Sequence, residues 1–139
     1  MPVSVEKLPD EPIIVAKLWD KLTSEDIRAV FVRSAALMAD IKGNVYRITD
    51  FSEADATFPE LLKMVSEGAK HAPGTSNDPR VKVCFVGSHA MGKLYVEFLR
   101  KQQFGAIQIP MHKSMEIALE SVRIQIANEQ PTPQPESDS

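Results

Sequence analysis

Short apolar runs alternate with segments whose apolar residues recur every three or four positions. Five runs have the length and flanking turn residues of β-strands, at positions 3–8, 13–18, 45–49, 81–86 and 106–109. Helical spacing predicts helices over about 23–40, from about 58, after 87 and from about 115. The resulting order is β-β-α-β-α-β-α-β-α, which is typical of an α/β domain with helices packed on one mixed sheet.

Local signals sharpen several of these boundaries. Pro9 and Pro12 interrupt pairing between the first two runs, so we expect those runs to form an antiparallel hairpin. Thr23 offers an N-cap to the first helix, with Asp26 in the capping-box position, and Ser114 offers an N-cap to the last. Residues 71–80 are rich in turn formers and predict a long loop, of a length typical of mobile or binding segments.

The fourth run and the helix after it indicate how the sheet is covered. Run 81–86 is apolar except for Lys82, as expected of a strand with both faces buried. We expect the following helix to bury four residues, namely Met91, Leu94, Tyr95 and Phe98.

Composition limits the class of protein. A chain of 139 residues suits one domain, which we place at 1–129, and the three prolines of 130–139 predict a disordered tail. The net charge of −3 gives no reason to expect nucleic-acid binding, and a single cysteine excludes an internal disulfide. We find neither a signal sequence nor a transmembrane segment, so we expect a soluble, cytoplasmic protein.

One motif raises the alternative of a nucleotide-binding protein. Gly87, Gly92 and Lys93 have the spacing of a phosphate-binding P-loop between a strand and a helix. Leu94 stands where that loop needs Ser or Thr to bind Mg²⁺, and we expect it to pack instead. In the competing structural interpretation, Gly87 ends the strand, Ser88 caps the helix and Lys93 faces water.

Other residues with chemical potential form no catalytic or metal-binding pattern. Cys84 lies within an apolar strand, which predicts an inert packed thiol rather than a nucleophile. Asp50 and Asp55 fall at a strand end and in a loop, where carboxylates are common. Three histidines lack the spacing of a metal-binding motif, namely His71, His89 and His112. We therefore expect no enzyme, metal or cofactor, although a small hydrolase with its site at the carboxyl ends of the strands stays open as an alternative.

The segment order resembles the SpoIIAA-like branch of the STAS-like domains over about residues 13–127. The resemblance rests on a strand ending in Val86-Gly87, an amphipathic helix, a short strand at 106–110 and a final helix beginning Glu116-Ile117-Ala118-Leu119. Asp50-Phe51 followed by 58–61 is similar to the strand-end aspartate and following helix of the family. The resemblance implies a STAS-like mixed five-stranded sheet with about four helices, used for protein interaction and in some members for apolar-ligand or membrane-surface binding.

The same resemblance implies two phosphorylation candidates, Ser52 and Thr57. Phosphoregulated members carry Ser or Thr at the start of the helix that follows the Asp-ending strand. Residues 55–57 are similar to that Asp-Ser-Ser element, and Asp50-x-Ser52 is similar to its upstream Asp-x-Ser. A phosphate there would suit a helix N-terminus, while Thr57 can equally serve as a plain helix cap.

We therefore expect a non-catalytic regulatory module that binds a regulatory protein partner or an apolar small molecule. It would use a helix face and the loops 50–57 and 71–80. The candidate ligand or interaction residues are Trp19, Asp50, Ser52, Thr57, Ser88 and His89. Trp19 suits a cavity rim, an interface or the edge of the core. Val32 and Ala36 lie off the main apolar stripe of the first helix, which leaves surface for a homodimer.

Overall fold

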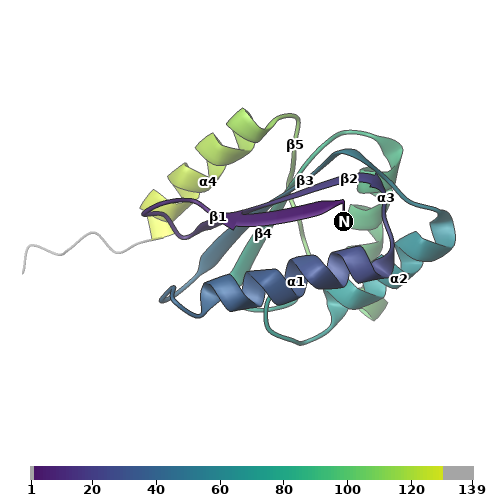
Figure 1. The fold of residues 1–139 in the computed structure, drawn as a ribbon, viewed down its shortest axis with the longest axis horizontal. Helices are drawn as coiled ribbons and strands as arrows, with labels where there is room; N and C mark the ends of the chain where they lie inside the picture. Colours follow the sequence, from purple (N-terminus) through teal and green to yellow (C-terminus); the bar gives the residue numbers. More distant parts are fainter. Residues whose placement is uncertain (1, 130–139) are drawn as a thin grey trace, which may run out of the picture.

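The computed structural model describes residues 2–129, which form five strands and four α-helices in the predicted order (Figure 1). The tail predicted over 130–139 lies outside the described residues. The strands are β1 (Val3–Lys7), β2 (Ile13–Lys21), β3 (Val45–Asp55), β4 (Val81–Val86) and β5 (Met111–His112). The helices are α1 (Ser24–Met38), α2 (Phe58–Ala69), α3 (Ala90–Leu99) and α4 (Met115–Glu129), with a 3-10 turn, η1 (Gln102–Phe104), after α3.

The predicted five-stranded mixed sheet is confirmed. Its strands lie in the order β1-β2-β3-β4-β5, in which β1 is antiparallel to β2 and the remaining pairs are parallel. The hairpin expected from Pro9 and Pro12 is the β1–β2 pair, with Val5 opposite Ala16. Each parallel step needs a helical crossover, so the chain order of strands and helices determines the arrangement.

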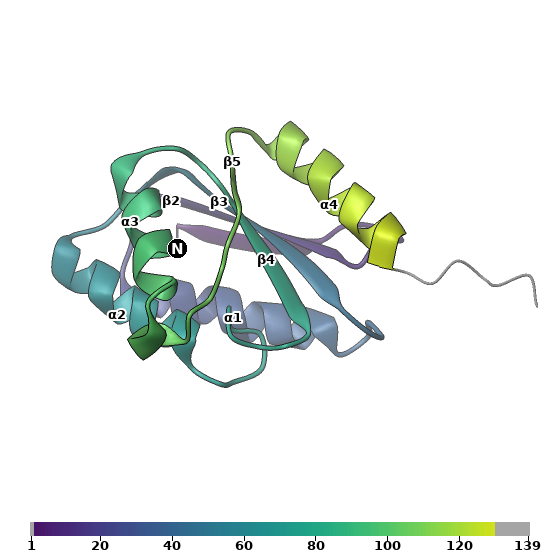
Figure 2. The ribbon, with the colours of Figure 1, turned by 180° about the vertical axis from the view of Figure 1, so that it is seen from behind.

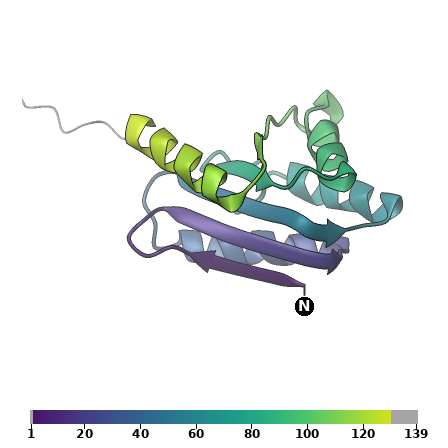
Figure 3. The ribbon, with the colours of Figure 1, turned by 90° about the horizontal axis from the view of Figure 1, so that it is seen from above.

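Helices cover both faces of the sheet, as Figures 2 and 3 show. On one face α1, α2 and α3 enclose the larger core, in which the rings of Phe51, Phe85 and Tyr95 meet. On the other face α4 packs Ala118 and Val122 onto β3 and β4. This two-sided cover explains the apolar sequence of β4.

The strand predicted at 106–109 is wrong, because that segment bonds to α3 instead of the sheet. Gly105 and Ala106 have left-handed backbones, with φ of 101° and 53°. The N–H of Ile107 then donates to the carbonyl of Leu99 at 2.7 Å. The chain reaches β4 only at Pro110, so β5 is two residues long and comes later than expected.

Two of the parallel strands run further than predicted. β3 continues past Thr49 to Asp55 and β2 past Leu18 to Lys21. The extra residues do not alternate between apolar and polar as a strand usually does, because Ser52 and Glu53 are consecutive polar residues and both are exposed. The extension matters because it carries the acidic end of β3 beyond the sheet core.

Side-chain caps set the starts of three helices, as predicted. The Asp26 carboxylate accepts the backbone N–H of Thr23 at 2.8 Å, at the start of α1. The Thr57 hydroxyl accepts the N–H of Glu60 in α2, and Ser114 accepts the N–H of Ile117 in α4. Each cap satisfies a backbone donor that a helix end would otherwise leave open.

A fully buried arginine, Arg47 of β3, holds the loop between α2 and β4. Its guanidinium donates to the Ser34 hydroxyl of α1 at 3.1 Å and to the Gly74 carbonyl, and it lies 3.5 Å from the Ser76 hydroxyl. Burial lowers the pKa of Arg47 to about 10, so it stays cationic at neutral pH. The loop expected to be free for binding is therefore packed, with Thr75 and Ser76 buried.

A pair of glycines tests how tightly this loop packs. Gly43 and Gly74 both have φ of +81°, so alanine strains the two backbones alike, by about 1–2 kcal/mol. A Cβ at Gly43 meets nothing within 4 Å, whereas one at Gly74 would lie 2.3 Å from the Phe31 carbonyl oxygen. We expect Gly74→Ala to lower the free energy of unfolding by about 2 kcal/mol more than Gly43→Ala, as overpacking does. Urea denaturation measures both, and equal losses would show that the loop can move away from α1.

Candidate interaction site at the carboxyl edge of the sheet

The carboxyl ends of β2 and β3 form a cleft of about 240 Å³. Parallel α/β sheets bind their ligands at this edge. The cleft brings together three predicted residues, Trp19, Asp50 and Ser52. Sequence reasoning missed its other lining residues, which are Lys17, Leu18 and Glu53.

A β-bulge shapes the floor of the cleft. Lys17 pairs with Asp50 and Trp19 pairs with Glu53, so two β3 residues lie opposite Leu18. The Asp50 carboxylate accepts hydrogen bonds from the backbone N–H and the hydroxyl of Ser52. These two hydrogen bonds satisfy polar groups that the bulge removes from the hydrogen-bond ladder of the sheet. Asp50 is buried and Ser52 is exposed.

Gly87 allows the turn after β4 to approach the bulge. Its φ of +136° lies in the region that favours glycine. A Cβ there would lie 3.4 Å from the backbone nitrogen of Ser52 and 3.5 Å from its Cα. The turn after β4 therefore packs on Ser52, the residue that is hydrogen-bonded to Asp50.

His89 ties the start of α3 to β3. Its Nε2 lies 2.8 Å from the Ala54 carbonyl and donates to it. The helix begins at Ala90 with His89 at the N-cap. The prediction that Ser88 caps this helix is therefore wrong, because the helix begins one residue later, and Ser88 is exposed in the turn.

Thr57 lies apart from the cleft lining. Its side chain caps α2, at 3.4 Å from the backbone nitrogen of Glu60. Glu60 in turn accepts the N–H of Ser24 at 3.0 Å, which joins the starts of α1 and α2. The helix-cap interpretation of Thr57 is confirmed, and its hydroxyl is exposed at a helix N-terminus.

The geometry after β4 does not favour the nucleotide-binding alternative. Only residues 87–89 separate β4 from α3, so Gly92 and Lys93 lie inside the first turns of the helix. A Cβ at Gly92 would lie 3.5 Å from the Met111 side chain, which shows that this glycine serves packing. The N–H of Lys93 donates to His89, and its side chain faces water. A phosphate-cradling loop is therefore not formed here.

The prediction that Leu94 packs in the core is wrong, because α3 packs through another face. Met91, Tyr95 and Leu99 are buried, while the Leu94 side chain is 38% exposed. Phe98 lies one turn after Leu94 on the same helix face and is only partly buried.

Leu94 belongs to an exposed apolar surface that joins α2 and α3. Phe58, at the start of α2, is 54% exposed, and its ring centroid is 6.1 Å from that of Phe98. The Phe98 ring is 6.3 Å from that of Phe104 in η1. We call Phe58, Leu94, Phe98 and Phe104 the aromatic patch. Sequence reasoning missed it, because helical spacing alone does not separate a core face from an exposed one.

The remaining candidates lie elsewhere. Loop 71–80 precedes β4 and lies at the amino edge of the sheet, so the structure does not bring it together with 50–57. Val32 is 63% exposed and Ala36 is exposed, while the homodimer that they suggest stays a prediction.

Three groups of observations concern chemistry and membranes. Cys84 is buried, as predicted, and burial raises the pKa of its thiol to about 11, so the thiol stays protonated at neutral pH. Residues 2–129 contain no cluster of three or more side chains able to hold a metal ion. No helix in this described part is long and apolar enough to span a bilayer.

Comparisons with known proteins concern the fold. No family model and no curated protein matches the chain. Among solved structures, an uncharacterised DUF3478 protein from Shewanella loihica PV-4, with a SpoIIAA-like fold, is 19% identical, with a TM-score of 0.55 over 86% of this chain and 90% of that one.

Two structures of SpoIIAA are also similar. The anti-sigma factor antagonist SpoIIAA in its unphosphorylated form is 12% identical, with a TM-score of 0.58 over 87% of this chain and 97% of that one. The Bacillus cell fate determinant SpoIIAA in its phosphorylated form is 10% identical, with a TM-score of 0.51 over 87% and 99%. Strand order, helix placement and these likenesses confirm the predicted SpoIIAA-like, STAS-type fold.

Proposed function

We propose that this chain is a non-catalytic regulatory module that binds a protein partner through the carboxyl edge of its sheet. The aromatic patch is the observation that carries the proposal. Phe58 and Leu94 expose large apolar side chains beside the strand ends, although both faces of the sheet are already covered. Aromatic side chains in such a setting are typical anchors of protein interfaces.

The cleft at the ends of β2 and β3 favours a protein partner over an apolar small molecule. Lys17, Asp50, Ser52 and Glu53 give it charged and hydroxyl groups, and Trp19 adds a half-buried ring. Charged and polar groups of this kind are typical of the rim of a protein interface. An apolar ligand would instead need a mostly apolar cavity.

The same groups argue against a hydrolase. Ser52 donates its hydroxyl to Asp50, while the His89 ring is hydrogen-bonded to the Ala54 carbonyl rather than to Ser52. A nucleophilic serine needs a base within hydrogen-bond reach and a third group to orient that base. The carboxyl edge contains a serine, a histidine and an aspartate, but the histidine is not hydrogen-bonded to the serine as a catalytic base would be.

We further propose that phosphorylation of Ser52 regulates the partner site. SpoIIAA, which shares this fold, has been solved in phosphorylated and unphosphorylated forms. Ser52 is exposed and donates to Asp50, and Glu53 follows it. A phosphoryl group removes the donated proton and adds about −2 charge beside these carboxylates. The repulsion would open the bulge that shapes the cleft. Thr57 is the alternative acceptor.

The partner surface is tested with charge placed on the aromatic patch. We expect Leu94→Glu and Phe58→Glu each to weaken partner binding by about 30-fold, the loss typical of interface hot spots. The measurement is quantitative mass spectrometry of proteins retained by the immobilised chain, followed by titration of the partner that is found. Ile124→Glu is the matched control, because Ile124 is 57% exposed on α4, across the sheet. A partner lost equally with Ile124→Glu would contradict the proposed location.

Regulation at Ser52 has its own test. We expect phosphopeptide mapping of the native protein to find phosphate on Ser52, and Ser52→Asp to weaken binding of the same partner about tenfold through repulsion by Asp50. Ser66→Asp, on the exposed side of α2, should leave binding unchanged. Phosphate found only on Thr57, or equal binding by Ser52→Asp and wild type, would overturn the assignment of Ser52.

A further inference from the structure

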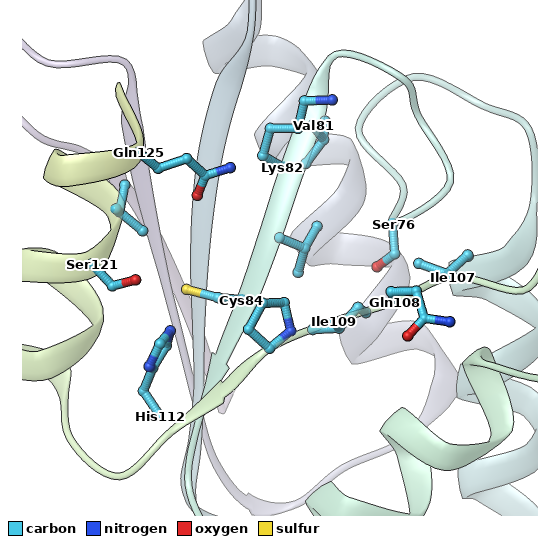
Figure 4. Close-up of a pocket in the computed structure, with 13 residues that line it drawn as sticks. Ser76, Val81, Lys82, Cys84, Ile107, Gln108, Ile109, His112, Ser121 and Gln125 are labelled. Carbon is cyan, nitrogen blue, oxygen red and sulfur yellow. The ribbon is translucent and has the colours of Figure 1, made fainter. Parts of the chain in front are cut away.

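A groove of about 280 Å³ opens along the outer edge of β4, between α4 and the segment that leads to β5 (Figure 4). β5 pairs only with Phe85 and Val86. Among residues 2–129, no strand lies beside the first part of β4, residues 81–84, on this side. The groove exists because the segment 106–109 bonds to α3 and leaves this part of the edge open.

The alternation of backbone groups shows what the groove offers. The N–H of Phe85 donates to Pro110, and that of Gly87 donates to His112. Every second residue of a strand directs its N–H to the same side. Val83 therefore directs its N–H and carbonyl into the groove, whereas the N–H of Val81 is taken by the Asp78 carbonyl.

The lining of the groove mixes apolar and polar side chains and includes one lysine. Figure 4 shows Ser121 and Gln125 of α4 on one side, Gln108 and Ile109 on the other and Lys82 at the amino end of the strand. Lys82 is the one permanently charged side chain of the lining, and its charge interacts with the Glu129 carboxylate at the end of α4. A segment with extended backbone and negative charge complements such a surface.

We propose that residues 130–139 of this chain bind in the groove as an added strand beside β4. The path of α4 supports this occupant. The Glu129 carboxylate accepts a hydrogen bond from the Tyr46 hydroxyl, and Tyr46 pairs with Lys82 across β3 and β4. The chain therefore leaves α4 at the open, amino-terminal end of the groove, from which a returning segment runs parallel to β4.

The sequence of this segment suits an edge strand. Its prolines occupy every second position, 131, 133 and 135, so Thr132, Gln134 and Glu136 carry the backbone N–H groups between them. In an extended chain those three N–H groups point to one side and the prolines to the other. Proline occurs in edge strands on the side that makes no ladder bonds. One side can thus pair with β4 while the other cannot extend the sheet.

Length and charge agree with the same occupant. Ten extended residues span about 33 Å, more than the four open residues of β4 require. The segment contains Glu136 and Asp138 and no cation, so it is attracted to Lys82. Its composition gives it no core of its own, and pairing with β4 supplies the partner that it needs.

Hydrogen exchange at the Val83 amide tests the docking in the full-length chain. Gln134→Pro removes a donor from the side that faces β4, whereas Pro133→Ala leaves that side intact. We expect Gln134→Pro to speed exchange of the Val83 amide about fivefold, the effect of losing one net hydrogen bond. Pro133→Ala should change it little. Exchange at Val122, within α4, serves as the control for an intact fold.

A charge exchange tests the same contact independently. Lys82→Glu and Glu136→Lys should each speed Val83 exchange, and the double variant should restore the wild-type rate. Strictly additive effects in the double variant would overturn the charge pairing. A Val83 amide that exchanges equally fast in wild type and in Gln134→Pro would overturn the docking itself and leave the edge open to a partner's strand.

Discussion

The burial of Arg47 is the constraint on which the packing at the amino edge of the sheet depends. A buried cation is costly unless hydrogen bonds replace its water. Its partners are neutral oxygens of Ser34, Gly74 and Ser76, and its Nε has no partner within residues 2–129. These oxygens come from α1 and from the loop before β4. If either element moved away, the buried guanidinium would lose hydrogen bonds that replace its water. The Phe31 ring, 5.0 Å away, adds a cation–π contact.

This arrangement makes the two edges of the sheet structurally different. At the amino edge, Arg47 packs the loop onto α1 and leaves little free polar backbone. At the carboxyl edge, the same strand carries Asp50 and Ser52 into a bulge, with Gly87 packed against them. Binding groups held by a rigid scaffold keep their positions at low entropic cost. The packed end thus supports the end at which the cleft opens.

Much of this could be predicted from sequence, because strand and helix periods differ and appear directly in the apolar pattern. The errors occur where bonding is non-local. Nothing in residues 106–109 reveals that Ile107 bonds to Leu99. Asp50 and Ser52 could be predicted as candidates, whereas their closeness to Trp19 depends on strand register. Arg47 gave no signal, since a single basic residue in a strand usually faces water.

Leu94 belongs both to the P-loop-like sequence after β4 and to the aromatic patch. A P-loop needs Ser or Thr at that position and a helix that begins later, so that backbone N–H groups surround phosphate. Here His89 bonds to Ala54 and α3 starts at Ala90, which places position 94 on the outer side of the helix beside Phe98. A hydroxyl there would serve no metal, whereas a leucine there extends an apolar surface toward Phe58. The same strand–turn–helix unit therefore presents an exposed apolar surface, which we propose as a protein-binding surface, instead of a loop for phosphate.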